Sequence, residues 1–174
     1  MMLISKQHPP RVFYGLVSQG LPVPLWLGLT EDGKVCRVHF APKNAARSPL
    51  KSWQSAWPST AFIKDQRAVE VWWKKAMKLK SPPPILLVGT PFQALVCMTL
   101  LTIPAGETIT YGELAERIGS PKAIRAVGAA LGKNPVAFFL PCHRVVTKGG
   151  LGGFAGGTTL KRHLLQSEGA KVLR

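Results

Sequence analysis

Three consecutive prolines, Pro82 to Pro84, divide this chain of 174 residues near its middle. A run of prolines cannot continue a helix, and it favours an extended connector. A chain of this length suits one compact domain or two small ones. We therefore expect an N-terminal domain at residues 1–84 and a C-terminal domain at residues 85–174.

The N-terminal half shows the pattern of a small sheet with one covering helix. Alternating apolar side chains predict three strands, and Glu31-Asp32-Gly33 has the composition of a hairpin turn. Further along, Val69, Trp73 and Ala76 recur at helical spacing. The expected elements are strands at 12–17, 25–29 and 34–40, an irregular segment at 41–60 and a helix at 63–79. This half holds no set of side chains that points to a reaction.

The C-terminal half is expected to be mostly helical. Thr110 and Glu113 have the spacing of a capping box at the start of one helix, and Ser120-Pro121 starts the next helix after a turn at Gly119. Two short helices joined by a tight turn are typical of a helix-turn-helix. Helices are expected at 90–101, 111–118, 121–131 and 159–168, and a buried strand at 136–140. The expected fold class is α+β: a small N-terminal α/β sheet domain, then this helical domain with a winged helix-turn-helix.

The second helix of this motif has an apolar face and a face of small residues. Ile124, Val127 and Leu131 recur at helical spacing and are expected to face inward. On the other face, Arg125 stands among glycines and alanines, which would let a partner approach the helix backbone closely. The same pattern fits an ordinary contact between two helices, so these residues alone leave both interpretations open.

The chain is strongly basic, with a formal charge of +15 and a pI near 10.3. Such a charge predicts attraction to a polyanion, chiefly nucleic acid or an anionic membrane surface, although a basic protein without such a partner is also consistent with it. From Arg117 onward the sequence has ten Lys and Arg residues and one acid, Glu168. It has no run of about 18 apolar residues for a membrane span and no apolar stretch for a signal peptide. We expect a cytoplasmic protein without a membrane partner.

Three cysteines, at 36, 97 and 142, are too few and too widely spaced for a disulfide framework. Cys36 and His39 lie three apart in an expected strand, so they point to opposite faces and are not expected to share a metal. Cys36 and Cys97 stand among apolar residues and are expected to be small buried hydrophobes.

Cys142 is the candidate for chemistry, because His143 follows it directly at the expected end of a strand. A thiol becomes a strong nucleophile when a neighbouring base takes its proton. Glu168 stands at i+8 from Leu160 on the apolar side of the last helix, so its carboxylate is expected to have a partner inside the protein. Cys, His and carboxylate together follow the logic of nucleophile, base and orienting group. A structural cysteine and a solvated Glu at a helix end remain the alternatives.

Pro141-Cys142-His143-Arg144-Val145-Val146 resembles the active-site signature of the O6-alkylguanine-DNA alkyltransferases, the methylated-DNA–protein-cysteine methyltransferases. The resemblance covers residues 89–169, and its specificity rests on several motifs in the same order. They are Gly89-Thr90-Pro91-Phe92-Gln93, Thr110-Tyr111-Gly112-Glu113-Leu114-Ala115, Arg125-Ala126-Val127-Gly128, Asn134-Pro135-Val136 and Gly153-Phe154-Ala155-Gly156-Gly157. Cys97, Ala105 and Lys133 depart from the family's usual residues, and none of them is a reacting group.

The resemblance implies a role for each matching residue. Cys142 would accept the alkyl group, His143 would take the thiol proton through a water, and Glu168 would orient His143. Asn134 would hold the turn before the site, Tyr111 would lie over the guanine, and Arg125 would enter the base stack as an arginine finger. DNA contacts would come from Ala123, Ala126, Gly128 and Ala129, and base contacts from Tyr111, Leu131, Val145, Ala155 and Gly156.

The implied function is repair of double-stranded DNA that contains O6-alkylguanine, approached from the minor groove with the damaged nucleotide flipped out. Transfer to Cys142 would give a thioether, so each protein molecule would act once, as a monomer, with no cofactor and no metal. Three other functions match parts of the pattern. An alkyltransferase-like recognition protein would lack the acceptor cysteine, a winged-helix transcription factor would not need the Cys-His-Glu set, and a thiol hydrolase would turn over.

Overall fold

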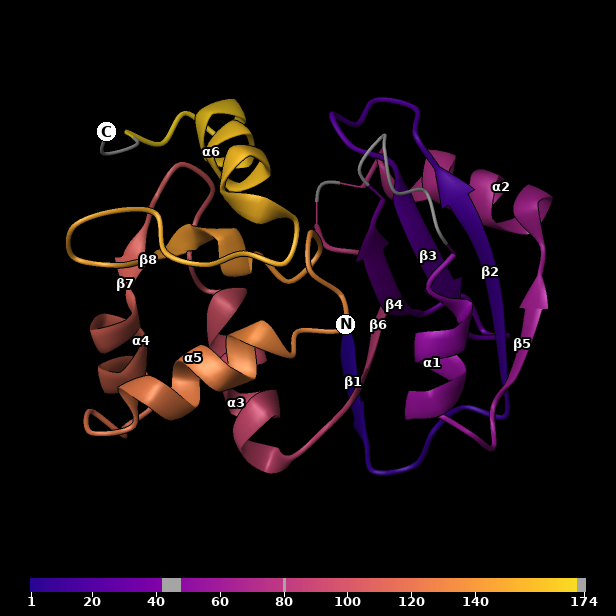
Figure 1. Ribbon diagram of the computed structural model, residues 1–174, viewed down its shortest axis with the longest axis horizontal. Helices are drawn as coiled ribbons and strands as arrows, with labels where there is room; N and C mark the ends of the chain where they lie inside the picture. Colours follow the sequence, from indigo (N-terminus) through magenta and orange to yellow (C-terminus); the bar gives the residue numbers. More distant parts are fainter. Residues whose placement is uncertain (42–47, 80, 172–174) are drawn as a thin grey trace. The chain divides into compact units, whose positions relative to one another are not determined.

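The computed structural model describes residues 1–41, 48–79 and 81–171 and forms two compact units, Met1–Gly89 and Thr90–Arg174 (Figure 1). The units divide after Gly89, whereas the sequence placed the boundary after Pro84. Strand β6 (Ile85–Val88) explains the difference, because it pairs in parallel with β1 (Met2–Ser5) and so belongs to the sheet of the first unit. The prolines thus precede the last strand of the first unit.

The first unit is built on a six-stranded sheet with the order β1-β6-β4-β3-β2-β5. Its remaining strands are β2 (Arg11–Val17), β3 (Leu25–Leu29), β4 (Val35–Phe40) and β5 (Ala61–Lys64). Strands β2, β3 and β4 form an antiparallel meander, which agrees with the three strands and the hairpin predicted from the sequence. Strands β1, β5 and β6 were not predicted, and each runs parallel to a neighbour.

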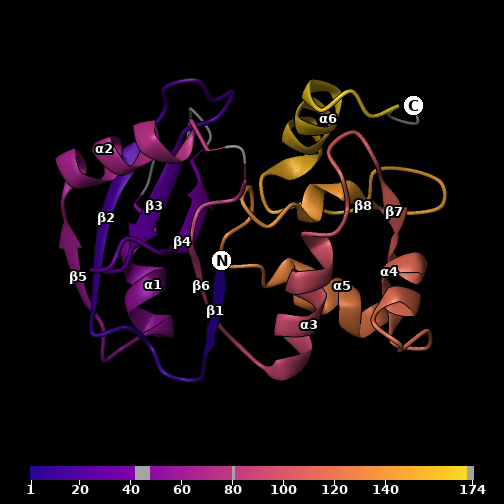
Figure 2. The same cartoon turned by 180° about the vertical axis from the view of Figure 1, so that it is seen from behind.

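Two helices, α1 (Leu50–Ala56) and α2 (Gln66–Ala76), cover opposite faces of this sheet (Figures 1 and 2). Successive side chains of a strand point to opposite faces, so Tyr14 and Gly15 of β2 mark the two sides. Trp53 of α1 packs edge-on against Tyr14, with 6.4 Å between ring centroids. On the other side, a Cβ atom at Gly15 would lie only 2.9 Å from Gln66 Oε1 of α2. Glycine at this position therefore lets α2 pack closely on the sheet.

Two sequence predictions for the first unit were wrong. The helix expected at 63–79 begins only at Gln66, because β5 occupies the preceding residues and Asp65 caps the helix by accepting a hydrogen bond from Ala68 N at 2.9 Å. The segment expected to be irregular, 41–60, contains α1. The part of that prediction at residues 42–47 lies outside the described residues.

Among the described residues, the second unit contains four α-helices, one short 3-10 helix and a two-stranded sheet. Its elements are α3 (Pro91–Leu100), β7 (Ile109–Thr110), α4 (Tyr111–Arg117), α5 (Ile124–Gly132), the 3-10 helix η1 (Cys142–Arg144), β8 (Val145–Val146) and α6 (Gly157–Ser167). The predicted capping box is confirmed, since Thr110 and Glu113 exchange hydrogen bonds at the start of α4. Mixed sheet and helices together confirm the α+β class. None of the helices among the described residues is long and apolar enough to cross a membrane.

The second helix of the predicted helix-turn-helix starts later than expected. Helix α5 begins at Ile124 and not at Pro121, because Ser120 to Ala123 form a turn in which Ala123 N donates to Ser120 O at 2.8 Å. Ile124 is 47% exposed, whereas Val127 and Leu131 are buried as predicted. The inward-facing stripe is therefore shorter by one turn, since the first residue of the helix extends past the core.

Candidate active site

Cys142 follows a turn that is held by the side chain of Asn134. Asn134 Nδ2 donates to Leu140 O at 3.0 Å, and Asn134 Oδ1 accepts from Val136 N at 3.1 Å. The amide thus bridges both ends of the loop, as backbone hydrogen bonds would in a strand pair. This geometry is consistent with the turn-holding role that the sequence predicted for Asn134.

The residues expected to form a strand at 136–140 form this turn. Phe139 N and Leu140 N both donate to Val136 O, at 3.2 and 3.1 Å, and Phe138 has φ = 96°. A positive φ is strained for a bulky residue and persists only where neighbouring contacts fix the backbone. Cys142 therefore stands in η1 after a constrained turn, and the prediction that it ends a strand was wrong.

A cavity of about 300 Å³ opens beside Cys142 in the second unit. Its lining residues are Tyr111, Gly128, Leu131, Gly132, Cys142, Gly153, Phe154 and Ala155. Most are small or apolar, and Cys142 itself is 7% exposed. The cavity is thus a hollow with a thiol in its wall, lined by residues from α4, α5, η1 and the glycine-rich loop.

Tyr111 lies close to the glycine-rich loop. A Cβ atom at Gly152 would lie 3.1 Å from Tyr111 Oη and 3.2 Å from Thr147 Cγ2, and the residue has φ = 69°. Only glycine satisfies both the conformation and the space at this position. Burial, followed by the negative charge of the Cys142 thiolate, raises the pKa of Tyr111, so its hydroxyl stays protonated and can donate a hydrogen bond.

The imidazole of His143, the residue after Cys142, contacts Glu168, as the sequence predicted. His143 Nε2 donates to Glu168 Oε1 at 2.8 Å, and His143 is 3% exposed. An ionised carboxylate can only accept, so the proton is on Nε2 and the neutral ring has a lone pair on Nδ1. Nδ1 is buried and has no hydrogen-bond partner among the described residues. The imidazole is therefore arranged as a base.

Arg144 is a second partner of Glu168, and the sequence did not reveal it. Its Nε and Nη2 atoms donate to the two carboxylate oxygens at 2.9 and 2.8 Å, and its Nη1 donates to Ile103 O at 2.5 Å. Burial alone would raise the pKa of Glu168, but the hydrogen bonds from His143 and Arg144 outweigh it and lower the pKa to about 2. Glu168 is therefore ionised and fixed in place at neutral pH.

Lys161 is a buried cation that was not predicted from the sequence. The residue is 0% exposed, and its Nζ donates to Val145 O at 2.6 Å and to Gly153 O at 3.2 Å. Burial lowers the pKa of Lys161 from 10.5 to about 8, although the charge of the Cys142 thiolate acts in the opposite direction. The signal was its position four residues before buried Leu165 on α6, which puts both side chains on one face.

The electrostatics of the thiol reflect these neighbours. Burial raises the pKa of Cys142, while the side chain of Asn134 and the ammonium of Lys161 lower it. Cys36 and Cys97 are both buried, as predicted, and burial raises the pKa of each to about 12. Cys142 thus differs from the other two in having a cavity, an adjacent imidazole and a buried cation near it.

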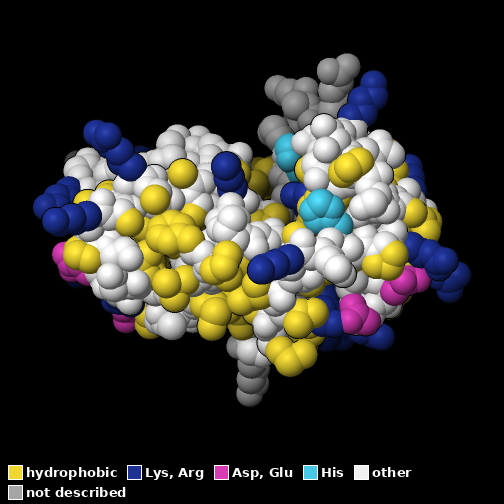
Figure 3. All heavy atoms as spheres, turned by 90° about the horizontal axis from the view of Figure 1, so that it is seen from below, with side chains coloured by type: hydrophobic (Ala, Val, Ile, Leu, Met, Phe, Trp, Pro, Cys, Tyr) yellow, Lys and Arg dark blue, Asp and Glu magenta, His cyan; other side chains and the backbone are white. Residues whose placement is uncertain are grey.

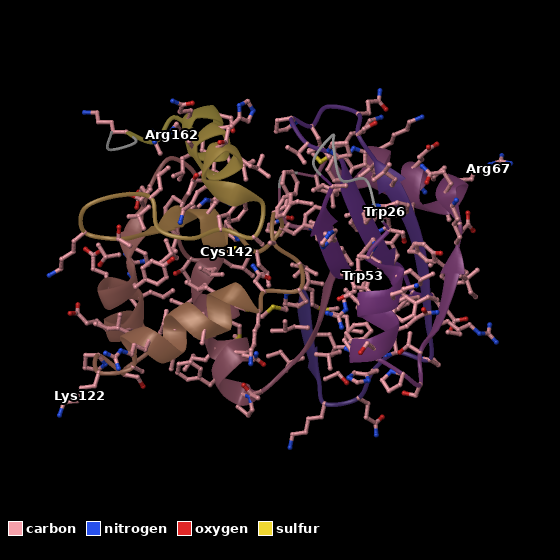
Figure 4. All side chains as sticks on the ribbon, in the orientation of Figure 1. Trp26, Trp53, Arg67, Lys122, Cys142 and Arg162 are labelled. Carbon is pink, nitrogen blue, oxygen red and sulfur yellow. The ribbon has the colours of Figure 1, made fainter. Side chains whose placement is uncertain are left out.

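Arg125 lies outside the cavity, on the exposed side of α5. Arg125, Ala126 and Ala129 are not buried in the core, so the face of small residues predicted around the arginine is open to a partner. Lys122, in the turn before α5, also projects into solvent (Figure 4). A helix face with one long cation and little else beyond the backbone can approach a polyanion closely.

Some predicted site residues lie apart from the cavity. Leu131 and Ala155 line it, but Val145, Gly156, Ala123, Ala126 and Ala129 are not among its lining residues. Val145 is fully buried, and its carbonyl is occupied by Lys161. Among the described residues no group of three or more His, Cys, Asp or Glu side chains could hold a metal ion.

A known protein family matches the second unit. The family profile described as "6-O-methylguanine DNA methyltransferase, DNA binding domain" matches residues 91–170. A Haemophilus influenzae protein named methylated-DNA–protein-cysteine methyltransferase is 38% identical over 148 residues, which are 84% of this chain and 82% of that protein. A Shigella flexneri protein of the same name is 52% identical over 86 residues, about half of each chain.

Solved structures extend the similarity to both units. The structure of Mycobacterium tuberculosis OGT in complex with DNA has a TM-score of 0.69 and 36% identity, and covers 90% of this chain and 93% of that chain. The O6-methylguanine-DNA methyltransferase from Pyrococcus kodakaraensis has a TM-score of 0.64 and 25% identity, and covers 91% of this chain and 99% of that chain. Both comparisons span the sheet unit as well as the helical unit.

Proposed function

The chain belongs to the methylated-DNA–protein-cysteine methyltransferase family, and from this premise we propose how its residues repair alkylated DNA. It is a DNA-binding repair protein that transfers an alkyl group to one of its own cysteines. The acceptor that we propose is Cys142, and the substrate is O6-alkylguanine in double-stranded DNA. The observation that carries the proposal is a thiol in the wall of a cavity, followed in the chain by a buried imidazole that contacts a half-buried carboxylate.

The proposed reaction is a single displacement. Cys142 gives its proton, through a water, to His143 Nδ1, which is buried and has no hydrogen-bond partner among the described residues. The thiolate sulfur attacks the alkyl carbon, the sulfur–carbon bond forms as the carbon–O6 bond breaks, and guanine leaves with the electron pair. The leaving guanine then takes up one proton. The product is a neutral thioether, which neither water nor thiols reverse, so each protein molecule acts once.

Glu168 and Arg144 serve His143 in this proposal. The carboxylate accepts from Nε2 at 2.8 Å and so fixes the tautomer that leaves Nδ1 free as a base. Arg144 donates two hydrogen bonds to the same carboxylate and a third to the carbonyl oxygen of Ile103, which fixes its position. Both act through His143, so they are positioning residues and do not touch the reacting atoms.

Lys161 supplies positive charge near the thiol. Its ammonium lowers the pKa of Cys142, and its two hydrogen bonds tie β8 to the glycine-rich loop that lines the cavity. A buried charge acts strongly because little water screens it. We propose that it helps the thiolate to form against the opposing effect of burial.

DNA approaches the exposed face of α5 through the minor groove in this proposal. The O6 atom of a stacked guanine is out of reach of a recessed thiol, so the nucleotide must leave the duplex. Arg125 is exposed beside Ala126 and Ala129, which is consistent with a side chain that enters the gap left by the base. Tyr111 lines the cavity and would contact the flipped guanine.

The replacement Cys142→Ser tests the acceptor. A serine hydroxyl is a far weaker nucleophile than a thiolate at neutral pH but nearly the same size. We expect loss of transfer from an O6-methylguanine duplex to below a few per cent, with the affinity for that duplex within about twofold of the original. Cys97→Ser is the matched control and should transfer normally. Retained transfer in Cys142→Ser would overturn the assignment.

A further inference from the structure

The first unit carries more of the positive charge than the unit that holds the reactive cysteine. Residues 1–89 contain 13 of the 23 Lys and Arg residues and 4 of the 8 acids, a formal charge of +9, and residues 90–174 supply the remaining +6. Figure 3 shows Lys and Arg side chains spread over the face in view, with fewer Asp and Glu. The proposed transfer chemistry gives this charge on the first unit no role.

Part of this charge is ordered on helix α2. Val69, Trp73 and Ala76 are buried against the sheet at 0%, 3% and 8% exposure, and this packing fixes the rotation of the helix. At 100° per residue, Arg67 and Lys74 point to the opposite side. Both are exposed, and Arg67 extends away from the sheet (Figure 4).

Lys78, in the turn that follows the helix, continues this line of cations. Its backbone N donates to Lys75 O, three residues back, which closes a turn directly after the helix, and Lys78 is exposed. With about 1.5 Å of rise per residue, Arg67 and Lys74 are about 10 Å apart along the helix axis. We call Arg67, Lys74 and Lys78 the α2 ridge.

No acidic side chain within the described part of the protein forms an ion pair with the α2 ridge. Among the described residues no carboxylate oxygen lies within 4.0 Å of Arg67, Lys74 or Lys78. Glu70 accepts from Gln66 Nε2 at 2.7 Å instead.

Helix stability explains only part of the ridge. Lys74 stands in the last turn, where a cation is favourable to the helix dipole, but Arg67 stands in the first turn, where it is unfavourable. Arg67 thus costs local stability and has no ion-pair partner among the described residues.

We propose that the α2 ridge is a second DNA-contacting surface, which binds backbone phosphates without reading sequence. The proposal rests on the proposed function only in taking DNA as the polyanion. Exposed, unpaired cations in a row match a regular array of phosphates, and each contact releases counterions. Such a surface would raise the affinity for undamaged DNA and so the time that the protein spends searching for a lesion.

The test measures how binding to a long undamaged duplex depends on salt, because a long duplex offers phosphates to every surface of the protein. The triple variant R67Q/K74Q/K78Q should lower the slope of log K against log salt by up to about 2.7, at roughly 0.9 for each lost contact. The control triple K6Q/K51Q/K171Q removes the same charge from exposed sites elsewhere and should change the slope much less. Equal slopes for the two triples would overturn the proposal.

Two further measurements separate this result from other causes. Alkyl transfer from free O6-benzylguanine needs no phosphate contact, so it should be the same in both triples and in the original protein. Failure of transfer from an O6-methylguanine duplex in the original protein would count against the proposed function and not against the ridge. The exchange variant R67K/K74R/K78R keeps the three positive charges, so the slope of log K against log salt should stay the same. A reduced slope in this variant would contradict the proposal that the ridge binds DNA through charge alone.

Discussion

Arg144 determines how Glu168 can influence His143. The guanidinium donates to both carboxylate oxygens, so the negative charge of Glu168 is already balanced before His143 gains a proton. The carboxylate therefore holds the ring in position more than it drives the formation of an imidazolium. Removing the carboxylate charge would leave the charge of Arg144 unbalanced and would remove the ionised acceptor that orients His143 Nε2.

Glu168→Gln should accordingly move the pH dependence of transfer to higher pH. The variant loses the ionised acceptor that fixes the proton on His143 Nε2, and the charge of Arg144 is left unbalanced, so the Cys142 thiolate forms less readily. The rate at pH 7 should fall about tenfold for every pH unit by which the profile moves, and raising the pH should restore part of it. The exposed control Glu116→Gln should keep the original profile. An unmoved profile for Glu168→Gln would limit Glu168 to a role in the fold.

The Glu168 carboxylate should also make the free energy of unfolding depend on pH. The pKa of Glu168 falls from 4.5 to about 2 on folding, so its contribution is fully present above pH 4.5 and is lost as the pH falls towards 2. Denaturant unfolding of the original protein and Glu168→Gln should give free energies that converge over this window. A constant difference between pH 5 and pH 2 would contradict the ion pair.

Lys161→Met should slow transfer at pH 7 and remove a rise in stability at alkaline pH. Loss of the ammonium raises the pKa of Cys142, and the methionine keeps the apolar stem of the side chain. In the original protein the unfolded chain binds more protons than the folded chain between pH 8 and pH 10.5, so folding stability should increase across that window. Arg162→Met, at an exposed neighbouring position, is the control. Identical pH–stability curves for the protein and Lys161→Met would show that Lys161 is not buried as a cation.

At the scale of elements, local signals were predictable and long-range ones were not. Thr110 and Glu113 fix the start of α4 through contacts three residues apart, and the sequence shows them directly. The run at 136–140 has the apolar composition of a strand, but the side chain of Asn134 closes it into a turn. Strands β1 and β6 pair across more than 80 residues, and each has only four residues, which is too short a pattern to predict either strand.

In the candidate site, too, residues within local motifs could be predicted and long-range contacts could not. Cys142, His143 and Glu168 could be predicted, because a motif and a helical stripe place them. Arg144 belongs to the same motif, but its hydrogen bonds to Glu168 depend on how η1 packs against the end of α6, which the sequence does not show. Lys161 was missed because a lysine on a helix is usually solvated, and only the fold shows that its ammonium meets two carbonyl groups.

Arg125 on helix α5 is the residue that we expect to act on the DNA stack. Arg125→Ala should slow repair of a modified guanine in duplex DNA much more than transfer from the free modified base. A side chain that fills the gap left by the flipped nucleotide matters only where a stack must be opened, which costs a few kcal/mol. Comparing the two rates in Arg125→Ala and in Lys122→Ala separates this role from general charge. Equal losses on both substrates would make Arg125 a structural residue.

At the scale of the whole molecule, two units divide the work. The helical unit contains the cavity, the thiol and the helix pair that we propose for DNA contact, while the sheet unit contributes a basic surface. The formal charge of +15 predicts binding to undamaged DNA that weakens steeply with salt. Affinity measured from about 50 to 200 mM salt should fall by orders of magnitude, and a flat response would be inconsistent with phosphate contacts.

The central claim is that Cys142 itself keeps the alkyl group. Mass spectrometry of the protein after incubation with excess O6-methylguanine duplex tests it most directly. We predict a gain of one methylene equivalent per protein molecule, located on the peptide that contains Cys142, and no further gain with longer incubation. An unmodified Cys142 beside repaired DNA, or a methyl group found on another residue, would contradict the account.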